Sequence, residues 1–192
     1  MKYSLGLVSV SFRNHTPEEI LTAMSSAGLE LIEWGSDVHA PPKKANEIAR
    51  LQEKYGIKCC SYGTYFKLGV TSIQELQAYI DSAKLLGTNI LRLWCGNKNS
   101  EKHTEKEKAE LFAICKAAAG IAESNGVVLC MECHNNTYTN TKESAYELMQ
   151  AVNSTAFRMY WQPNQYRSAE ENIEYAKLLS PYTVHLHVFN WR

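Results

Sequence analysis

The sequence lacks an excess of charge of either sign, a long apolar run and a basic, apolar leader. Its 20 lysine and arginine residues balance 20 aspartate and glutamate residues, so we expect neither nucleic acid nor a membrane surface as a partner. No apolar run approaches the roughly 20 residues needed to span a bilayer. No segment at the start has the pattern of a secretory signal, which predicts a cytoplasmic protein.

The six cysteines fit a reducing compartment. Cys130 and Cys133 have the C-x-x-C spacing of a redox or zinc motif. Both lie in a predicted strand, however, where a separation of three residues puts their side chains on opposite faces. We therefore expect buried free thiols.

Apolar strands alternate with helical stretches, and helix starts and stops carry clear signals. Thr16, Pro17 and Glu19, for example, form a capped helix start. The predicted strands are Tyr3–Ser11, Leu29–Trp34, Ile57–Tyr62, Asn89–Trp94, Val127–Cys133, Phe157–Gln162 and Thr183–Phe189. The predicted helices are Thr16–Ala27, Lys43–Tyr55, Ser72–Leu86, Thr104–Ser124, Thr141–Val152 and Ser168–Leu179.

This alternation predicts βαβ units and a parallel sheet. Units of about 27 residues favour an α/β fold of the (β/α)₈ TIM-barrel type, which normally has about 250 residues. A doubly wound sheet is the alternative, but it usually carries a glycine-rich turn after its first strand, and residues 11–16 contain no glycine. We expect one domain over residues 1–192 that lacks the eighth βα unit.

The missing unit has three possible explanations: a longer natural protein, a partner chain that completes the sheet, or a barrel closed with fewer strands. We favour the first. The first and last strands would otherwise present unpaired edges, which promote association, so a homo-oligomer stays open.

Polar and aromatic residues gather where the predicted strands end, and a parallel barrel brings such ends to one mouth. If Glu132, Gln162 and His187 point inward, they form a candidate set of metal ligands on three successive strands. A carboxylate, an amide oxygen and an imidazole suit Mn²⁺, Mg²⁺, Co²⁺ or Zn²⁺, and His185 shares the face of His187. The alternative is a pocket lined by hydrogen-bonded polar residues without metal.

Other strand-end residues are candidate substrate contacts. Glu33 either contacts substrate or is a structural hydrogen-bond partner, and His39 lies on the loop that follows it. Trp34 and Trp94 would supply an apolar wall for a sugar ring. Arg92 either binds an anionic group or pairs with Glu33, because a buried charge needs a partner.

The chain resembles the xylose isomerase-like TIM barrels, the sugar phosphate isomerase/epimerase superfamily, over its whole length. The resemblance is carried by the order and spacing of IEWG at 32–35, DVHAP at 37–41, MECH at 131–134, YWQP at 160–163 and HLHV at 185–188. In that family the metal ligands are typically Glu, Asp, His and Glu after strands five to eight. Glu132 and His187 match this set, Gln162 occupies the Asp position, and the strand-eight Glu lies in the missing unit.

The resemblance implies isomerisation or epimerisation of a sugar or sugar phosphate. The metal would lower the cost of an enediolate, and Glu132 would be one of two carboxylates that carry the proton. Because the other one is missing, we expect the chain alone not to turn over. His134 and His185 are further candidate substrate contacts.

Three alternatives stand beside the isomerase. Gln162 favours a non-catalytic carbohydrate-binding or regulatory barrel. A cofactor-free lyase or dehydratase would use His134 and His187. An endonuclease IV-like activity would need many more His and acidic ligands for its three metals, and zero net charge argues against DNA.

Overall fold

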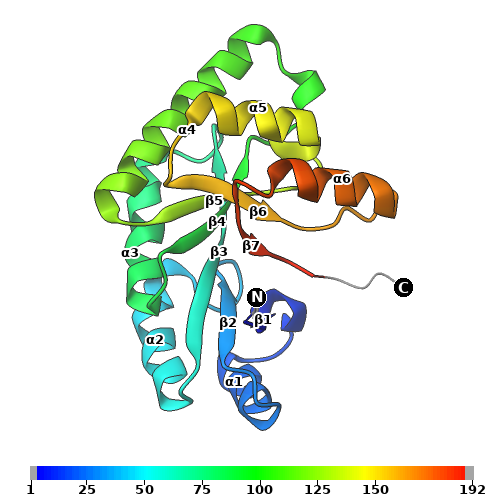
Figure 1. Ribbon diagram of the computed structural model, residues 1–192. Helices are drawn as coiled ribbons and strands as arrows, with labels where there is room; N and C mark the ends of the chain where they lie inside the picture. The colour runs from blue at the N-terminus through cyan, green and yellow to red at the C-terminus, as the bar shows by residue number, and fades with distance from the viewer. Residues whose placement is uncertain (1–3, 189–192) are drawn as a thin grey trace. The chain divides into compact units, whose positions relative to one another are not determined.

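Strands and helices alternate as predicted in the computed structural model of the protein, which describes residues 4–188. The strands are β1 Gly6–Val8, β2 Leu31–Gly35, β3 Lys58–Leu68, β4 Ile90–Cys95, β5 Val128–Glu132, β6 Phe157–Trp161 and β7 Thr183–Leu186 (Figure 1). The α-helices are α1 Pro17–Ser26, α2 Ala45–Lys54, α3 Leu76–Leu86, α4 Glu105–Asn125, α5 Lys142–Val152 and α6 Ala169–Leu179. No eighth strand occurs among residues 4–188.

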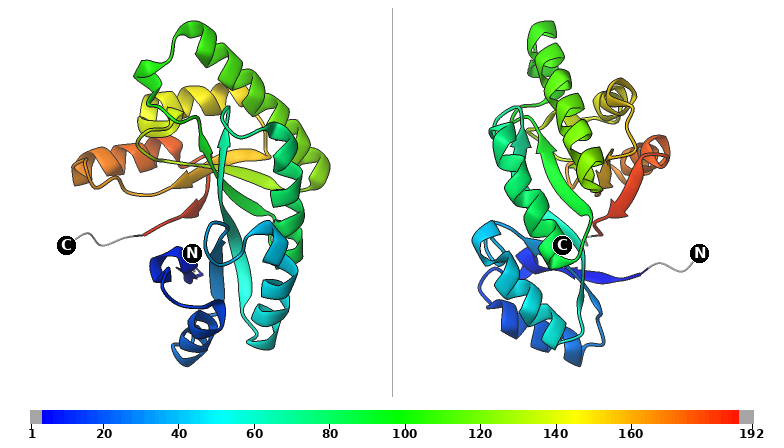
Figure 2. Two further views of the ribbon diagram at one scale, coloured as in Figure 1. Left: turned by 180° about the vertical axis from the view of Figure 1, so that it is seen from behind. Right: turned by 90° about the vertical axis from the view of Figure 1, so that its left-hand side faces the viewer.

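The chain divides into two compact units. The first comprises Met1–Tyr65 and Gln77–Leu91, and the second comprises Phe66–Leu76 and Arg92–Arg192. In the first unit β1, β2 and β3 pair in parallel. The second has the order β4-β5-β6-β7, with β5, β6 and β7 paired in parallel and α4, α5 and α6 along one side of its strands (Figure 2). The single domain predicted from the sequence stays a prediction.

Helix starts follow the capping signals of the sequence. The hydroxyl of Thr16 accepts from the backbone N–H of Glu19, and the Glu19 carboxylate accepts from the backbone N–H of Thr16 at 2.7 Å. These bonds satisfy donors that a helix start leaves unpaired. The same box occurs at Thr104 with Glu107 and at Ser168 with Glu171. Local chemistry therefore fixes where these helices begin.

The first and the third strand differ most from their predicted lengths. The first strand is shorter, because Ser9–Phe12 forms a 3₁₀ turn; its predicted start at Tyr3 lies outside the described residues, as does Phe189 at the end of the last strand. The third strand is longer and runs through Tyr65 and Phe66 to Leu68, a stretch predicted to be a loop. Aromatic side chains favour a pleated, half-buried surface, which explains the extension.

Two shifts in strand register position polar side chains. The pairing of β2 with β3 shifts between Ile32 and Glu33, so that Glu33 lies opposite Ser61. The pairing of β6 with β7 shifts between Met159 and Tyr160, so that Tyr160 lies opposite His185. Such bulges are common beside functional sites because they re-aim side chains.

The interior of each unit is apolar. Trp34, Tyr62 and Ile80 are fully buried in the first unit, and Phe157 and Tyr160 are nearly so in the second. None of the described helices has the length and apolar character required to cross a membrane.

Candidate functional site

Glu132, at the end of β5, is the centre of a buried polar cluster in the second unit. Its Oε2 accepts a hydrogen bond from Nη1 of Arg92 in β4 at 2.6 Å, and each side chain of this ion pair is 5% exposed. The carboxyl ends of neighbouring parallel strands lie at one sheet edge, which brings the two residues together although they are 40 positions apart. The sequence did not reveal this pairing, because partner choice depends on strand order and side-chain direction.

Trp94, at the end of β4, connects several groups of the cluster. Its Nε1–H donates to the same Oε2 of Glu132. Its ring stacks on His134 with the ring centres 5.0 Å apart and an angle of 29° between the planes. Nζ of Lys67 lies 4.9 Å from the centre of a Trp94 ring, within the range of a cation–π interaction. Trp94 is half-buried and lies beside Glu132 and His134; its role as a wall for a sugar ring stays a prediction.

Gln162 and His187 lie together directly after the neighbouring strands β6 and β7. The Gln162 Nε2 donates to the carbonyl of Cys133 at 3.2 Å, which directs its Oε1 toward Nδ1 of His187 at 3.3 Å. An amide oxygen only accepts, so Nδ1 of His187 carries the proton in this pair. The ring of Tyr160 contacts His187 edge-on, with the ring centres 4.5 Å apart, and stacks on His185, with the ring centres 4.6 Å apart. Gln162 and His187 are therefore in contact, and their role as ligands or substrate contacts stays a prediction.

Asparagine side chains connect the loops that follow β4, β5 and β6. Asn164 donates to the Oδ1 of Asn135 at 2.8 Å, and the Oδ1 of Asn99 accepts from the backbone N–H of Asn136 at 2.7 Å. The Oδ1 of Asn140 accepts from the backbone of Ser100 at 2.8 Å. The sequence analysis missed this network; the clustering of asparagine after strands was the available signal. It holds the loop that carries His134.

In the first unit Glu33 is a buried carboxylate, 1% exposed. It accepts a hydrogen bond from the hydroxyl of Ser61 on β3. The register shift between β2 and β3 creates this contact. Of the two roles expected for Glu33, the contact with Ser61 matches that of a structural hydrogen-bond partner.

His39, 3% exposed, uses both ring nitrogens inside the protein. Nε2 lies 3.1 Å from the carbonyl of His15 and donates to it, while Nδ1 lies 3.1 Å from the hydroxyl of Ser9. That hydroxyl in turn accepts from the backbone N–H of Gly35 at 2.9 Å. Burial lowers the pKa of His39, because desolvation disfavours its charged form. This arrangement leaves no nitrogen for a substrate and corrects the predicted role of His39.

Trp34 also has a different role from the one expected. It is fully buried, and its Nε1–H donates at 2.8 Å to Oε1 of Gln52 in α2. The amide of Gln52 donates in turn to the carbonyl of Leu86 at 2.8 Å. Neighbouring residues of a strand point to opposite faces, so an inward Glu33 already required an outward Trp34. Trp34 is therefore a core residue and does not line a substrate pocket.

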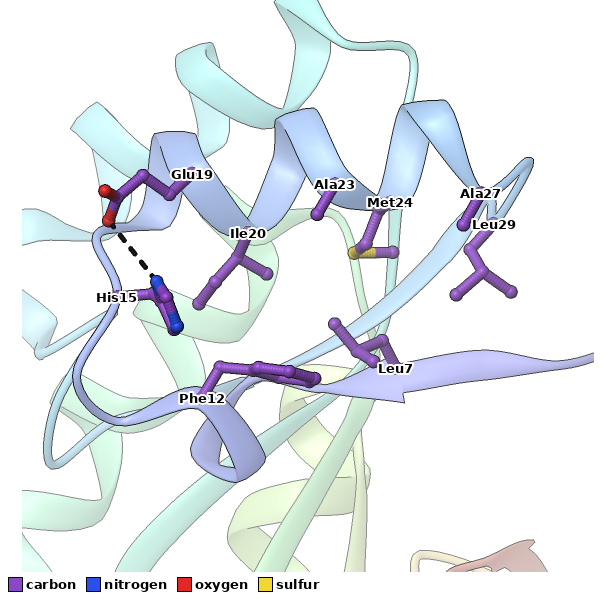
Figure 3. A pocket seen from close by; sticks show the side chains of 9 residues that line it. All are labelled: Leu7, Phe12, His15, Glu19, Ile20, Ala23, Met24, Ala27 and Leu29. Carbon is purple, nitrogen blue, oxygen red and sulfur yellow. Dashed lines mark ion pairs between the residues drawn. The ribbon is translucent and has the colours of Figure 1, made fainter.

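An apolar groove of about 410 Å³ runs along α1 in the first unit (Figure 3). Phe12, Met24 and Leu7 belong to its lining. Its charged groups are His15 and Glu19, whose Nδ1 and Oε2 lie 3.8 Å apart at one end. The groove offers apolar surface, whereas the chemistry of proton transfer is gathered around Glu132.

The cysteines are free thiols, and all but Cys60 are buried, as expected. Burial raises the pKa of Cys133 to about 12, so this thiol stays protonated near neutral pH and is a poor nucleophile.

The strand order, the helices between the strands and the polar strand ends define a member of the β/α-barrel class. The model of the Xylose isomerase-like TIM barrel family matches residues 21–192, and the chain belongs to this family. The predicted fold class is thereby confirmed. No curated protein sequence matches the chain.

Solved structures share this fold at low sequence identity. The probable 3-DHS dehydratase AsbF from Bacillus anthracis is 20% identical with a TM-score of 0.82, over 97% of this chain and 72% of that one. The 3-keto-D-glucoside 4-epimerase YcjR from E. coli is 12% identical with a TM-score of 0.76, over 98% and 80%. The IOLI protein, solved with a zinc atom, is 17% identical with a TM-score of 0.76, over 97% and 72%.

A divalent metal is thus plausible within the family, but the three predicted ligands of this chain do not fit one as they are arranged. Glu132 is the one carboxylate among them, and its Oε2 already accepts from Arg92 and Trp94. Oε1 of Gln162 is directed at His187. A divalent ion at Glu132 would face the Arg92 guanidinium, which already offsets the one negative charge of the three ligands, and ligand charge governs affinity. Among residues 4–188 no group of three or more His, Cys, Asp or Glu side chains is placed to hold a metal.

Proposed function

We propose that the protein is a sugar-modifying enzyme of the isomerase/epimerase class and that Glu132 is its proton carrier. Family membership and a neighbour that is a sugar epimerase support the class. Glu132 supports the role, because it is the one buried carboxylate among the described residues of the second unit. The proposal depends on this single observation.

The proposed reaction begins with proton abstraction next to a carbonyl. The carboxylate of Glu132 takes the proton from the carbon, and the C–H electron pair becomes the carbon–carbon double bond while the carbonyl oxygen gains the negative charge. The hydroxyl proton of the carbon that lost its C–H then passes to the former carbonyl oxygen, and the carboxylic acid of Glu132, whose proton exchanges with solvent, returns a proton to the former carbonyl carbon. The remaining oxygen becomes the new carbonyl, so exchange at this carbon requires one carboxylate only. Inversion at one carbon needs a second group on the opposite face.

The surroundings of Glu132 suit such a step. Arg92 is bound to the carboxylate, so its positive charge stays beside the reacting groups as the negative charge moves to the substrate oxygen. Trp94 offers an aromatic face to a sugar ring, and His134 stacked on it offers a polar group. Gln162, His187 and His185 would bind hydroxyl groups. We derive no step through a metal, and we keep the cytoplasmic location and a homo-oligomer as proposals.

A non-catalytic carbohydrate-binding barrel is the second candidate. Gln162 favours it, since the amide makes two hydrogen bonds within the protein, to Cys133 and His187, and carries no charge. A binding protein would hold a sugar against Trp94 without exchanging any carbon-bound proton.

Exchange of carbon-bound protons separates the two candidates. We expect D-fructose or D-xylulose incubated with the protein in deuterated, chelator-treated buffer to lose a C–H signal next to the carbonyl by NMR. The change Glu132→Gln should slow the exchange by about a hundredfold or more, the range of a general base. Glu110→Gln, on exposed helix α4, is the matched control. Unchanged exchange in Glu132→Gln contradicts the proposal, and sugar binding without exchange supports the second candidate.

A further inference from the structure

We infer that Lys67 is an anion-recognition group and that the substrate of the Glu132 cluster is an acidic sugar derivative, carrying a phosphate or a carboxylate. This inference deepens the proposed function and rests on it for the identity of the site. It starts from a lysine that no sequence pattern singled out.

The backbone of Lys67 is held firmly at the end of β3. Its N–H donates to the hydroxyl of Thr71 at 3.2 Å, and its carbonyl accepts from the backbone N–H groups of Val70 at 3.0 Å and Thr71 at 2.8 Å. Gly69 permits this turn with a φ of +79°, where a Cβ would lie 2.8 Å from Leu111. The turn therefore fixes the backbone position from which the Lys67 side chain extends.

The ammonium group of Lys67 lies over Trp94 and forms no ion pair with a carboxylate among the described residues. Lys67 is half-buried, and its Nζ lies 4.9 Å from the centre of the Trp94 ring. Four of the other lysines of the second unit have acidic partners: Lys98 with Glu107, Lys106 with Glu110, Lys108 with Glu147 and Lys142 with Glu174. The nearby charge of Glu132 is bound to Arg92. Lys67 thus keeps an uncompensated charge beside the candidate site.

A bound oxyanion would satisfy that charge better than the ring does. A cation–π contact contributes about 0.5–2 kcal/mol, whereas a charge-assisted hydrogen bond is roughly twice as strong as a neutral one. His134, stacked on the same indole, binds the carbonyl of Asn135 through Nδ1 at 2.6 Å, and its Nε2 has no hydrogen-bond partner among the described residues. That nitrogen is available as a second contact.

Trp94 ties the proposed anion group to the proton carrier. The Nζ of Lys67 lies over its ring, and its Nε1–H donates a hydrogen bond to the carboxylate of Glu132. A ligand lying along this indole would place an anionic end at Lys67 and its carbon chain near Glu132. A sugar phosphate and a sugar acid both have this form, and their common chemistry is a terminal oxyanion.

Calorimetric titration with four named probes tests the inference: D-fructose 6-phosphate, D-gluconate, neutral D-fructose and inorganic phosphate. We expect an anionic sugar to bind about tenfold or more tightly than fructose, as a charge-assisted hydrogen bond predicts, with the preference weakening as salt screens the charge. Preference for the phosphate or for the acid identifies the source of the oxyanion. Inorganic phosphate binding as tightly as the sugar phosphate would mean an adventitious ion only and would overturn the substrate assignment.

Three variants complete the test. Lys67→Met should remove the preference for the anion, Lys67→Arg should retain it, and Lys98→Met should leave it unchanged. Equal affinity for anionic and neutral sugars, no binding of either anionic sugar, or a preference that survives in Lys67→Met each overturns the inference. Binding in Glu132→Gln separates the two proposals: exchange lost with the preference kept supports both, whereas exchange kept overturns the proposed function alone.

Discussion

Both units place a buried glutamate at or near a strand end, but the two surroundings differ. In the first unit Glu33 is bound by the hydroxyl of Ser61, and nearby His39 uses both nitrogens within the protein. In the second unit Glu132 is bound by Arg92 and Trp94, beside a lysine with no carboxylate partner among the described residues. A polar residue at a strand end is thus a functional candidate only when bonding capacity is left over.

The largest expected effect is on the buried ion pair of the second unit. Arg92→Met removes one partner and leaves the carboxylate of Glu132 in an interior where each side chain is 5% exposed. Such a loss costs about 3–5 kcal/mol of unfolding free energy, because an uncompensated buried charge remains. Urea denaturation followed by circular dichroism measures the change.

The double variant Arg92→Met with Glu132→Met is the control for that measurement. Since apolar replacement of a whole buried pair is often close to neutral, it should recover most of the lost stability. A double variant that is less stable than the single one would show that Glu132 stabilises the unit through contacts other than Arg92, such as the one with Trp94.

The two tryptophans sharpen the comparison further. Trp34→Phe leaves the buried Oε1 of Gln52 without the donor it has at 2.8 Å, which costs about 1–3 kcal/mol and leaves sugar binding unchanged. Trp94→Phe removes a donor to Glu132 at a half-buried position, so we expect weaker sugar binding and slower proton exchange. Thermal unfolding and calorimetric titration of both variants provide the readouts. Weaker sugar binding in Trp34→Phe would contradict this and show that Trp34 contributes to the sugar site.

Local signals of the sequence predicted the helices well. Thr16 with Glu19 and Thr104 with Glu107 are reciprocal caps separated by three residues, so their chemistry is readable without tertiary structure. Strand parity led to the prediction that Gln162 and His187 share a face, because the period of two is a property of the strand itself. The family followed from the order of motifs along the chain.

Features that depend on distant partners were not readable. The predicted strand ended at Tyr62, whereas β3 continues to Leu68, because Gly63 resembles a loop residue until neighbouring strands supply its hydrogen bonds. The pairing of Arg92 with Glu132 spans 40 positions. Lys67 was not singled out for the same reason. Its proposed role depends on its contact with Trp94, which lies 27 positions later and on another strand. The candidate site was therefore predicted in its residue types and only partly in its contacts.

The smallest of the expected effects is the pH dependence that His39 gives the first unit. Its pKa is lowered by burial, so below the ordinary histidine pKa of about 6.5 the unfolded chain binds more protons than the folded one. The unfolding free energy therefore falls as the pH drops below that value, and it continues to fall until the folded protein is protonated as well. Denaturant titrations at successive pH values between neutrality and mild acid measure the slope.

Two histidine variants isolate this contribution. His39→Asn should be less stable than the parent at neutral pH, because it loses the bonds to Ser9 and His15, but its stability should depend less on pH in the acid range. His15→Gln removes an exposed imidazole while keeping the backbone carbonyl that His39 uses, so it should retain the parental slope. A slope that persists unchanged in His39→Asn would assign the pH dependence to other groups and contradict the prediction.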